Sequence, residues 1–211
     1  MDVTRGVYPV LIGGNWKFED LTQFANEYQK LYGLYFHLVS ESHLVSQSTT
    51  ADFPWRGGYS TVILFQKLYN RVPYDFRPQI KRMQYASPGF IELTTAVEVA
   101  EQLSKLIAFV SGSLYMAFGV YKKIQKDLSV LKLTTASAKR EEIELADQYA
   151  DFIESSIDEI APYLGEQHKK QILSMAPNKL AALKLQLTVF RRIKPLADMH
   201  SRGLIRDDDD R

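Results

Sequence analysis

The residue types that most often carry chemistry are present in this chain, but none has the spacing of a known catalytic or metal-binding motif. The four histidines, His37, His43, His168 and His200, are scattered, and the sequence contains no HExxH or facial-triad spacing. The chain has no cysteine, which excludes disulfides, thiolate metal sites and a cysteine nucleophile. We therefore expect no catalytic residue, no metal and no cofactor.

Three other features resemble parts of active sites without completing them. Gly13 and Gly14 lie between an apolar run and a helical pattern, but the GxGxxG and GK[ST] patterns are missing and Trp16 would crowd a phosphate. Ser87 lacks the GxSxG frame of a hydrolase nucleophile. The paired acids of residues 141–159 would act as in a glycosidase only within a cleft. We interpret these features as a tight turn, a turn-capping hydroxyl and a solvated helix face.

Length, composition and charge narrow the class of protein. At 211 residues with 45% apolar content, the chain can form one domain with an appendage or two small domains. A net charge of +1 gives no general signature of nucleic-acid binding, which usually requires a basic excess. The N-terminal stretch lacks the charged and apolar regions of a secretory signal, so we expect a cytoplasmic protein.

The stretch from Gln79 to Thr95 carries the clearest local signal. It contains two short extended runs around Ser87, Pro88 and Gly89, and a long apolar helical pattern follows it. The order of these three residues is typical of a type II turn, with the glycine at positive φ. Because type II turns splay the strands of a tight hairpin, we expect a wider loop or a corner here.

The element order predicts an α+β fold with a ferredoxin-like β-α-β-β-α-β domain. All but four of the aromatic residues lie at or before Tyr121, which suggests that this mixed domain forms the first part of the chain. The helix after the first strand is predicted to be capped by Asp20. The expected elements are a strand at 7–12, a helix at 20–39, a helix at 60–70, strands on both sides of Ser87, a helix at 97–124 with a weak point at 111–113, and a last strand at 128–133.

Leu, Ile, Ala, Lys and Glu at helical spacing dominate the rest of the chain. We predict an α+β domain over residues 1–135 with an insert at 43–76, and a helical hairpin or bundle extension over residues 139–205. Residues 206–211 read as an acidic, disordered tail.

Charge changes sign along the helical extension. Acids line one face of residues 141–163, and basic residues predominate after Gly165. This pattern predicts an antiparallel helical hairpin with complementary charged flanks. The alternative is a basic face that binds an acidic protein, nucleic acid or anionic lipid. The candidate interaction residues are Lys169, Lys170, Arg191 and Arg192, together with the aromatic residues Phe53, Trp55, Tyr74 and Phe76 of the insert.

Residues 106–121 form an uncharged run of sixteen residues, flanked by Lys105 and Lys122. This run is shorter than the roughly 20 residues of a membrane-spanning helix, so we interpret it as a core helix. Peripheral or marginal insertion into a membrane is the alternative, because small residues and flanking lysines are tolerated there.

The segment KRMQYASPGFIEL, from Lys81 to Leu93, resembles a pattern of bacterial proteins in which a strand ends in a Tyr/Phe-x-Ser-Pro-Gly turn before a long helix. The helix upstream, edLxxFxxxYxxLYxL in this pattern, matches Glu19 to Leu34. Such modules are similar to the TRADD-N-like adaptor domains proposed for bacterial conflict and antiphage signalling. The resemblance covers about residues 7–134 and implies an adaptor without catalytic residues.

Three functional hypotheses follow from the sequence. The first is a non-enzymatic interaction, adaptor or oligomerisation module in bacterial defence signalling, which binds a protein partner or a second copy of itself. The second is a membrane-associated effector or regulator that uses residues 106–121. The third is an enzyme whose site is built from tyrosine, arginine and aspartate residues outside any recognised motif.

Overall fold

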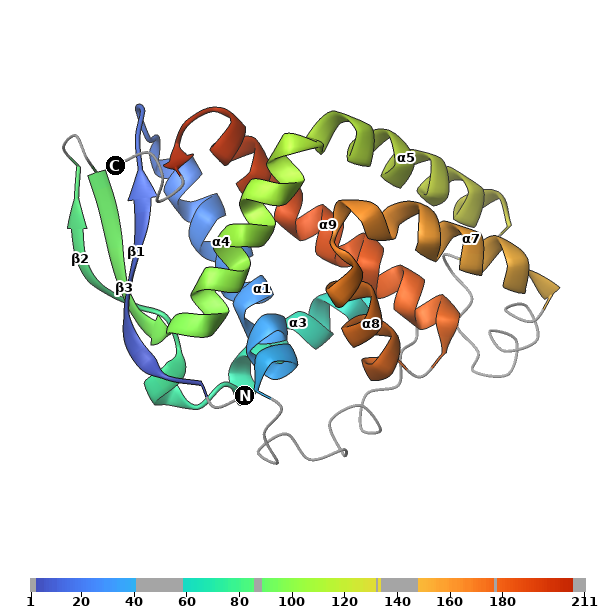
Figure 1. The fold of residues 1–211 in the computed structure, drawn as a ribbon, viewed down its shortest axis with the longest axis horizontal. Coiled ribbons are helices and arrows are strands. Elements are labelled where there is room, and N and C mark those ends of the chain that lie inside the picture. The colour runs from blue at the N-terminus through green and yellow to red at the C-terminus, as the bar shows by residue number, and fades with distance from the viewer. Residues whose placement is uncertain are drawn as a thin grey trace. The chain divides into compact units, whose positions relative to one another are not determined.

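The protein has a mixed α+β fold (Figure 1). Seven α-helices and one four-stranded antiparallel sheet occur among the residues that the computed structural model describes. Those residues are 3–40, 59–85, 89–131, 133, 148–176 and 178–206. Contacts divide the chain into two compact units, the first comprising residues 1–45, 65–112 and 192–211, and the second comprising residues 46–64 and 113–191.

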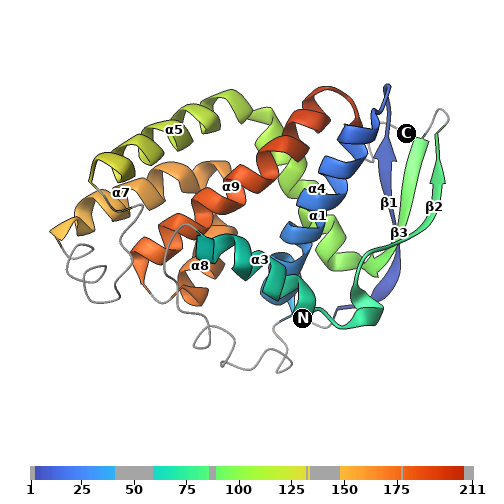
Figure 2. The same cartoon turned by 180° about the vertical axis from the view of Figure 1, so that it is seen from behind.

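The sheet belongs to the first unit and has the strand order β2-β3-β1-β4, with every neighbouring pair antiparallel. Figure 2 shows β1, β3 and β2 side by side. The strands are β1 (Arg5–Ile12), β2 (Gln79–Gln84), β3 (Gly89–Ala96) and β4 (Ile205–Arg206). The predicted strand at 7–12 and the two strands around Ser87 are therefore confirmed, while Ser87 and Pro88 lie outside the described residues and Gly89 is the first residue of β3.

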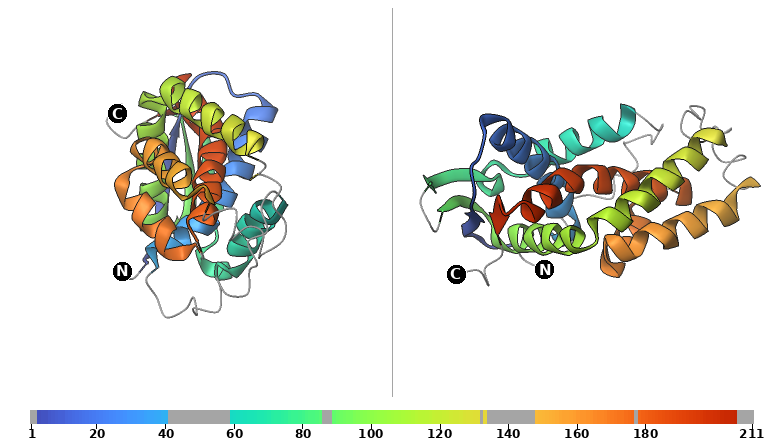
Figure 3. Two further views of the ribbon diagram at one scale, coloured as in Figure 1. Left: turned by 90° about the vertical axis from the view of Figure 1, so that its right-hand side faces the viewer. Right: turned by 90° about the horizontal axis from the view of Figure 1, so that it is seen from above.

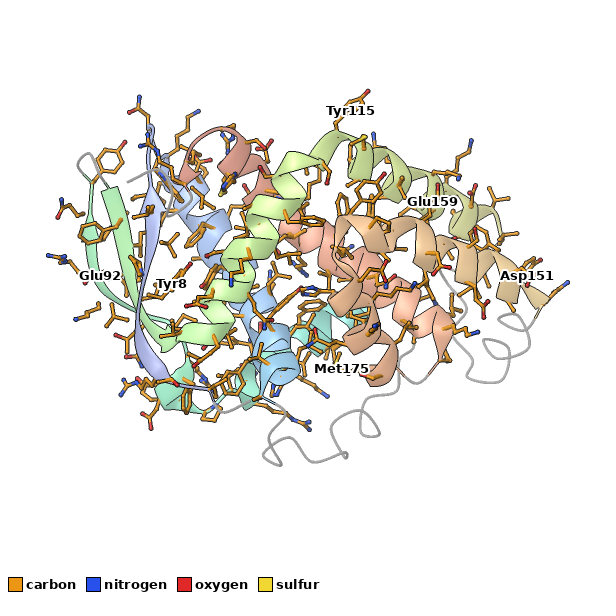
Figure 4. All side chains as sticks on the ribbon, in the orientation of Figure 1. Tyr8, Glu92, Tyr115, Asp151, Glu159 and Met175 are labelled. Carbon is orange, nitrogen blue, oxygen red and sulfur yellow. The ribbon has the colours of Figure 1, made fainter. Side chains whose placement is uncertain are left out.

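Alternation along β1 and β3 decides which face of the sheet is buried. Val10 pairs with Ile91 and both side chains are buried, while the next pair, Pro9 with Glu92, lies on the opposite face. Tyr8 pairs with Leu93 on the buried face, so the labelled Tyr8 and Glu92 lie on opposite sides of the sheet in Figure 4. A period of two places every second side chain against the helices.

Helices α1 (Phe18–Val39) and α4 (Val97–Gly112) pack on one face of this sheet (Figures 1 and 3). The predicted spacing of apolar residues in α1 is confirmed, since Phe24, Tyr28, Leu31 and Tyr35 are all buried. The helix begins at Phe18, so Asp20 is its third residue rather than the predicted cap. Its carboxylate accepts a hydrogen bond from the Lys17 N–H at 3.0 Å, and this bond lowers the Asp20 pKa.

Tyr32 connects α1 to two other elements through its hydroxyl group. The hydroxyl donates to the carbonyl oxygen of Phe76 at 2.6 Å, and it accepts from the N–H of Ala96, at the end of β3, at 3.0 Å. Phe76 belongs to the short 3₁₀-helix η1 (Tyr74–Phe76), and its ring packs on Phe36 with centroids 5.7 Å apart. The Tyr32 side chain is fully buried, and burial raises its pKa.

The predicted weak point at residues 111–113 is confirmed, because α4 ends at Gly112 and α5 (Leu114–Val130) begins after Ser113. The predicted strand at 128–133 is wrong. Leu128 to Val130 complete α5, in which Ala117, Ile124 and Leu128 are buried at helical spacing. The β-branched residue Val130 is therefore the last residue of this helix rather than part of a strand. The last strand is β4 instead.

The second unit is helical and contains α5, α7 (Ala150–Ile160), the 3₁₀-helix η2 (Ala161–Tyr163), α8 (Glu166–Met175) and the first part of α9 (Lys179–Ser201). Helices α5 and α7 lie side by side (Figures 1 and 3). From Leu180 to Phe190 every residue of α9 except Lys184 is buried, as expected of a central helix.

Ion pairs link the acids of α7 to lysines of the surrounding helices, which supports the prediction of complementary charged flanks. Lys123 of α5 pairs with Glu159 at 2.8 Å, and Lys169 of α8 pairs with Asp158 at 2.8 Å. Lys179 of α9 pairs with Glu154. All three pairs are at the surface, where water and salt screen the charges, so they contribute little to the stability of the fold.

The two compact units differ from the predicted division at residue 135. Residues 113–131 belong to the helical unit because α5 packs against α7, and the end of the chain returns to the sheet as β4. The helices from α5 to α9 thus lie in sequence between α4 and the last strand. The predicted helix at 60–70 is confirmed as α3 (Tyr59–Arg71), which runs from one unit into the other. Residues 43–58, the boundary at 134–139 and the acidic residues 207–210 lie outside the described residues.

None of the described helices is, by itself, long and apolar enough to cross a membrane. Helices α4 and α5 meet the length and composition criteria only together, as a bent pair. The uncharged run at 106–121 is divided between these two helices.

Replacement of Tyr32 by phenylalanine tests the hydroxyl bridge. The Tyr32→Phe variant leaves the buried Ala96 N–H and the Phe76 carbonyl without this partner, so we expect the free energy of unfolding to fall by about 1–3 kcal/mol. Urea denaturation followed by circular dichroism measures the change. Tyr74→Phe, an exposed tyrosine in η1, serves as the control and should leave stability unchanged. Equal stability of the wild type and Tyr32→Phe would contradict the structural role of the bridge.

His168 makes stability depend on pH. Burial lowers its pKa from 6.5 to about 4, so below pH 6.5 the unfolded chain binds a proton that the folded chain does not bind until near pH 4. Stability therefore falls as the pH is lowered from 6.5, by about 2 kcal/mol at pH 5 from this group. Urea midpoints measured between pH 7 and pH 5 should show this loss, and His168→Gln should remove most of it. An unchanged pH dependence in the variant would refute the assignment.

Candidate functional site at the end of the sheet

A pocket of about 220 Å³ lies where β1 ends and β3 begins. Ile12, the last residue of β1, and residues 13–15, which follow it toward α1, form one side of the pocket. Tyr85, just after β2, and Gly89, at the start of β3, form a second side, and Arg206 of β4 completes the lining. All of these residues belong to the first unit, so the pocket is built from parts of one compact body.

The connection after β1 is held to the end of the chain by a single carbonyl group. The Leu204 carbonyl oxygen accepts hydrogen bonds from the Gly13 N–H at 3.0 Å and from the Trp16 indole N–H at 3.1 Å. Gly14 follows with φ of +65°, a backbone conformation that favours glycine. The two glycines therefore form a fixed turn, as the sequence predicted, and this turn also forms part of the pocket.

The end of α9 determines the position of Arg206. The Leu204 N–H donates to the Met199 carbonyl and the Gly203 N–H donates to the His200 carbonyl, each at 2.9 Å. With Gly203 at φ of +73°, these bonds form a Schellman motif that ends the helix. The chain then pairs with β1, with Arg206 opposite Leu11.

Arg206 lies directly over the backbone of Gly13. A Cβ atom built on Gly13 would lie 2.6 Å from both Cζ and Nη2 of the guanidinium group. Any larger residue at position 13 would thus displace Arg206.

Tyr85 forms the opposite wall of the pocket. Its hydroxyl donates to the Gly14 carbonyl oxygen at 2.8 Å, which joins the end of β2 to the turn after β1. Its ring remains 59% exposed. An exposed aromatic ring held by its hydroxyl group can provide a rigid contact surface for a ligand.

A β-bulge in β2 extends this surface along the strand. The register shifts between Ile80 and Arg82, so that Ile80 faces Leu93 and Met83 faces Ile91 on the side of the sheet that carries the helices. Ile80 and Met83 are 63% and 41% exposed. Together with Tyr85 they form an apolar row about 15 Å long, which we call the β2 row.

The opposite face of β2 is occupied by interactions within the sheet. Arg82 pairs with Glu92 at 3.1 Å, and its guanidinium lies 4.6 Å from the centroid of the Phe90 ring. The β2 row is therefore the apolar side of the strand.

One serine–histidine contact occurs elsewhere in the first unit. Ser111 Oγ lies 2.9 Å from His200 Nδ1, and Ser201 Oγ donates to Ser111 Oγ at 3.4 Å. A hydroxyl beside an imidazole is the minimal arrangement of an activated nucleophile. Here the contact ties α4 to the last turn of α9, directly before the Schellman motif, and we interpret it as structural. Among the described residues, no group of three histidine, aspartate or glutamate side chains could hold a metal ion.

The predicted interaction residues do not come together in one site. Tyr74 is 73% exposed, but Phe76 packs within the first unit, and Phe53 and Trp55 lie outside the described residues. Lys169 is paired with Asp158, as described above. Arg192 donates to both carboxylate oxygens of Glu27, at 2.9 and 3.1 Å, and stabilises the fold. Lys170 and Arg191 are exposed.

Sequence analysis did not identify the pocket as a site. Tyr85 and Gly89 belong to the turn motif, and the sequence pattern of Gly13 and Gly14 indicates a tight turn rather than a binding site. No sequence pattern indicated Arg206, because the two-residue strand to which it belongs directly precedes an acidic run and is too short to be recognised. Comparisons with protein-family models, curated proteins and solved structures gave no match.

Proposed function

We propose that this protein is a non-enzymatic interaction module that binds a segment of a partner protein along the β2 row. The observation that carries this proposal is the alignment of Ile80 and Met83 on one exposed face of an edge strand, with the exposed Tyr85 directly after the strand. Large apolar side chains that line up beside a pocket are typical of a binding surface, whereas scattered exposed ones are ordinary. Burial of these partly exposed apolar side chains favours a complex through the hydrophobic effect.

The strand itself indicates how a partner is bound. A bulge and the basic residues Lys81 and Arg82 are features that disfavour the addition of another strand to a sheet edge. A second copy of β2 would also place like charges opposite one another. We therefore propose a different protein as the partner, one that packs across the helix-side face of β2 and carries acidic residues beside its apolar ones.

The finer architecture is also part of this proposal. We infer that the first unit is a variant of the ferredoxin-like fold in which the helices from α5 to α9 are inserted before the last strand. The strand order β2-β3-β1-β4 and the placement of α1 after β1 and α4 after β3 support this inference. The resemblance of residues 81–93 to TRADD-N-like adaptors is the basis on which we propose bacterial defence signalling in the cytoplasm as the setting.

Selection from a library of random short peptides displayed on phage tests the proposal. We expect the wild-type chain to enrich peptides rich in apolar residues, and the double variant Ile80→Gln, Met83→Gln to reduce that enrichment at least about tenfold, since a tenfold change corresponds to about 1.4 kcal/mol. Val130→Gln, a 71% exposed apolar residue of α5, is the matched control. No enrichment by the wild type, or equal enrichment by the double variant, would refute the proposal.

Helix α5 carries the second candidate function, contact with a membrane surface. Tyr115 and Met116 are 92% and 59% exposed, and Lys122 and Lys126 are exposed further along the same helix. Figure 4 shows Tyr115 pointing away from α5. Exposed apolar groups next to lysines are typical of helices that lie in the interface of anionic membranes.

Flotation with vesicles that contain phosphatidylserine tests this second candidate. If α5 contacts the membrane, a fraction of the protein floats, and Tyr115→Ser with Met116→Ser lowers that fraction several-fold because the inserted apolar area is lost. Tyr74→Ser removes a comparably exposed tyrosine from η1 and should have no effect. Protein that stays entirely at the bottom of the gradient would exclude this function.

A further inference from the structure

We infer that the pocket at the end of the β2 row is a carboxylate-binding subsite, which receives an acidic side chain or the terminal carboxylate of the bound segment. This inference rests on the proposed function, because Tyr85 belongs both to the β2 row and to the pocket wall. A segment that lies along Ile80 and Met83 would therefore reach the pocket at its Tyr85 end.

The cation of this subsite is Arg206. Its backbone is fixed by pairing with Leu11, and its guanidinium lies over the glycine turn. Among the described residues no carboxylate pairs with this guanidinium, in contrast to Arg82, Arg192 and Arg202, which each have an acidic partner. A positioned arginine with no acidic partner among these residues is suited to an external anion, because its planar fork matches a carboxylate.

The remaining polar groups agree with a ligand that is larger than a simple ion. Asn15 contributes an amide whose NH₂ group can donate a hydrogen bond. The Tyr85 hydroxyl donates its proton to Gly14, so its ring is fixed and offers an apolar surface to the carbon atoms of a ligand. The volume of about 220 Å³ accommodates a carboxylate together with the short carbon chain that bears it.

The number of charges favours a carboxylate over a phosphate group. Arg206 is the one cationic residue among the described residues of the lining, and it can neutralise the single charge of a carboxylate. A phosphate monoester carries about −1.5 to −2 at pH 7 and would retain uncompensated charge in this pocket. An aspartate, a glutamate or a chain terminus therefore matches the site.

NMR titration of the full-length, ¹⁵N-labelled protein with succinate tests the inference. We expect saturable shifts of the Gly13, Gly14 and Asn15 amide signals with succinate, and no such shifts with the uncharged analogue succinamide. The same titration is made on a chain with asparagine at positions 207–210, because the native aspartates could compete for Arg206.

Two variants isolate the role of the guanidinium. Arg206→Met should weaken succinate binding about tenfold or more, as expected for loss of a charge-assisted hydrogen bond. Gly13→Ala should weaken it as well, since the new methyl group displaces Arg206 while its charge remains. Lys81→Met makes the same change of charge on β2, outside the pocket lining, and should leave the affinity unchanged.

The outcomes separate this inference from the proposed function. Absence of saturable succinate binding in both chains, equal binding by Arg206→Met, or tighter binding of inorganic phosphate than of succinate would overturn the carboxylate subsite. The double variant Ile80→Gln, Met83→Gln should still bind succinate. If peptides are selected through the β2 row but succinate does not bind, the interaction module stands without the subsite. If succinate binds but no peptide is selected, the proposed interaction module is refuted and the carboxylate-binding pocket stands.

Discussion

The buried hydroxyl of Tyr32 is the interaction on which the architecture of the first unit depends. It joins the middle of α1 to the end of β3 through Ala96 and to η1 through Phe76. Because η1 leads directly into β2, this hydroxyl sets the path by which β2 reaches the sheet edge. Neither α1 nor α4 makes an extensive contact with β2, and the side chains of the β2 row remain exposed.

The pocket depends on residues that are far apart in the sequence. The Leu204 carbonyl holds Gly13 and Trp16, the latter 188 positions away, and the Schellman motif at Gly203 turns the chain so that Arg206 reaches the end of β1. The serine–histidine contact between α4 and α9 lies immediately before this turn. The helical insertion therefore returns the chain to the sheet at the place where the proposed subsite needs a cation.

Local patterns in the sequence predicted β1, β2, β3, α1, α3 and the break between α4 and α5. The buried residues of β3 and α1 recur at periods of two and about 3.6, whereas β2 was indicated by the turn residues that follow it and the break by the small residues 111–113. Such patterns did not predict β4, whose two residues show no periodicity, and they assigned residues 128–133 to a strand although Leu128 to Val130 are the last residues of α5. They also could not show that Arg192 forms an ion pair with Glu27, because these two residues are 165 positions apart in the sequence. The candidate site escaped prediction for the same reason: Arg206 and Gly13 meet only in the folded chain.

The central claim is that the β2 row and the Arg206 pocket form one continuous binding surface. The most direct measurement is amide chemical-shift mapping with an apolar, acidic peptide obtained by selection on the wild-type chain. The account predicts that signals of residues 80–85 and of residues 13–15 shift together, with one common dissociation constant. Shifts confined to one of the two groups, two different dissociation constants, or shifts located on α5 instead would contradict it.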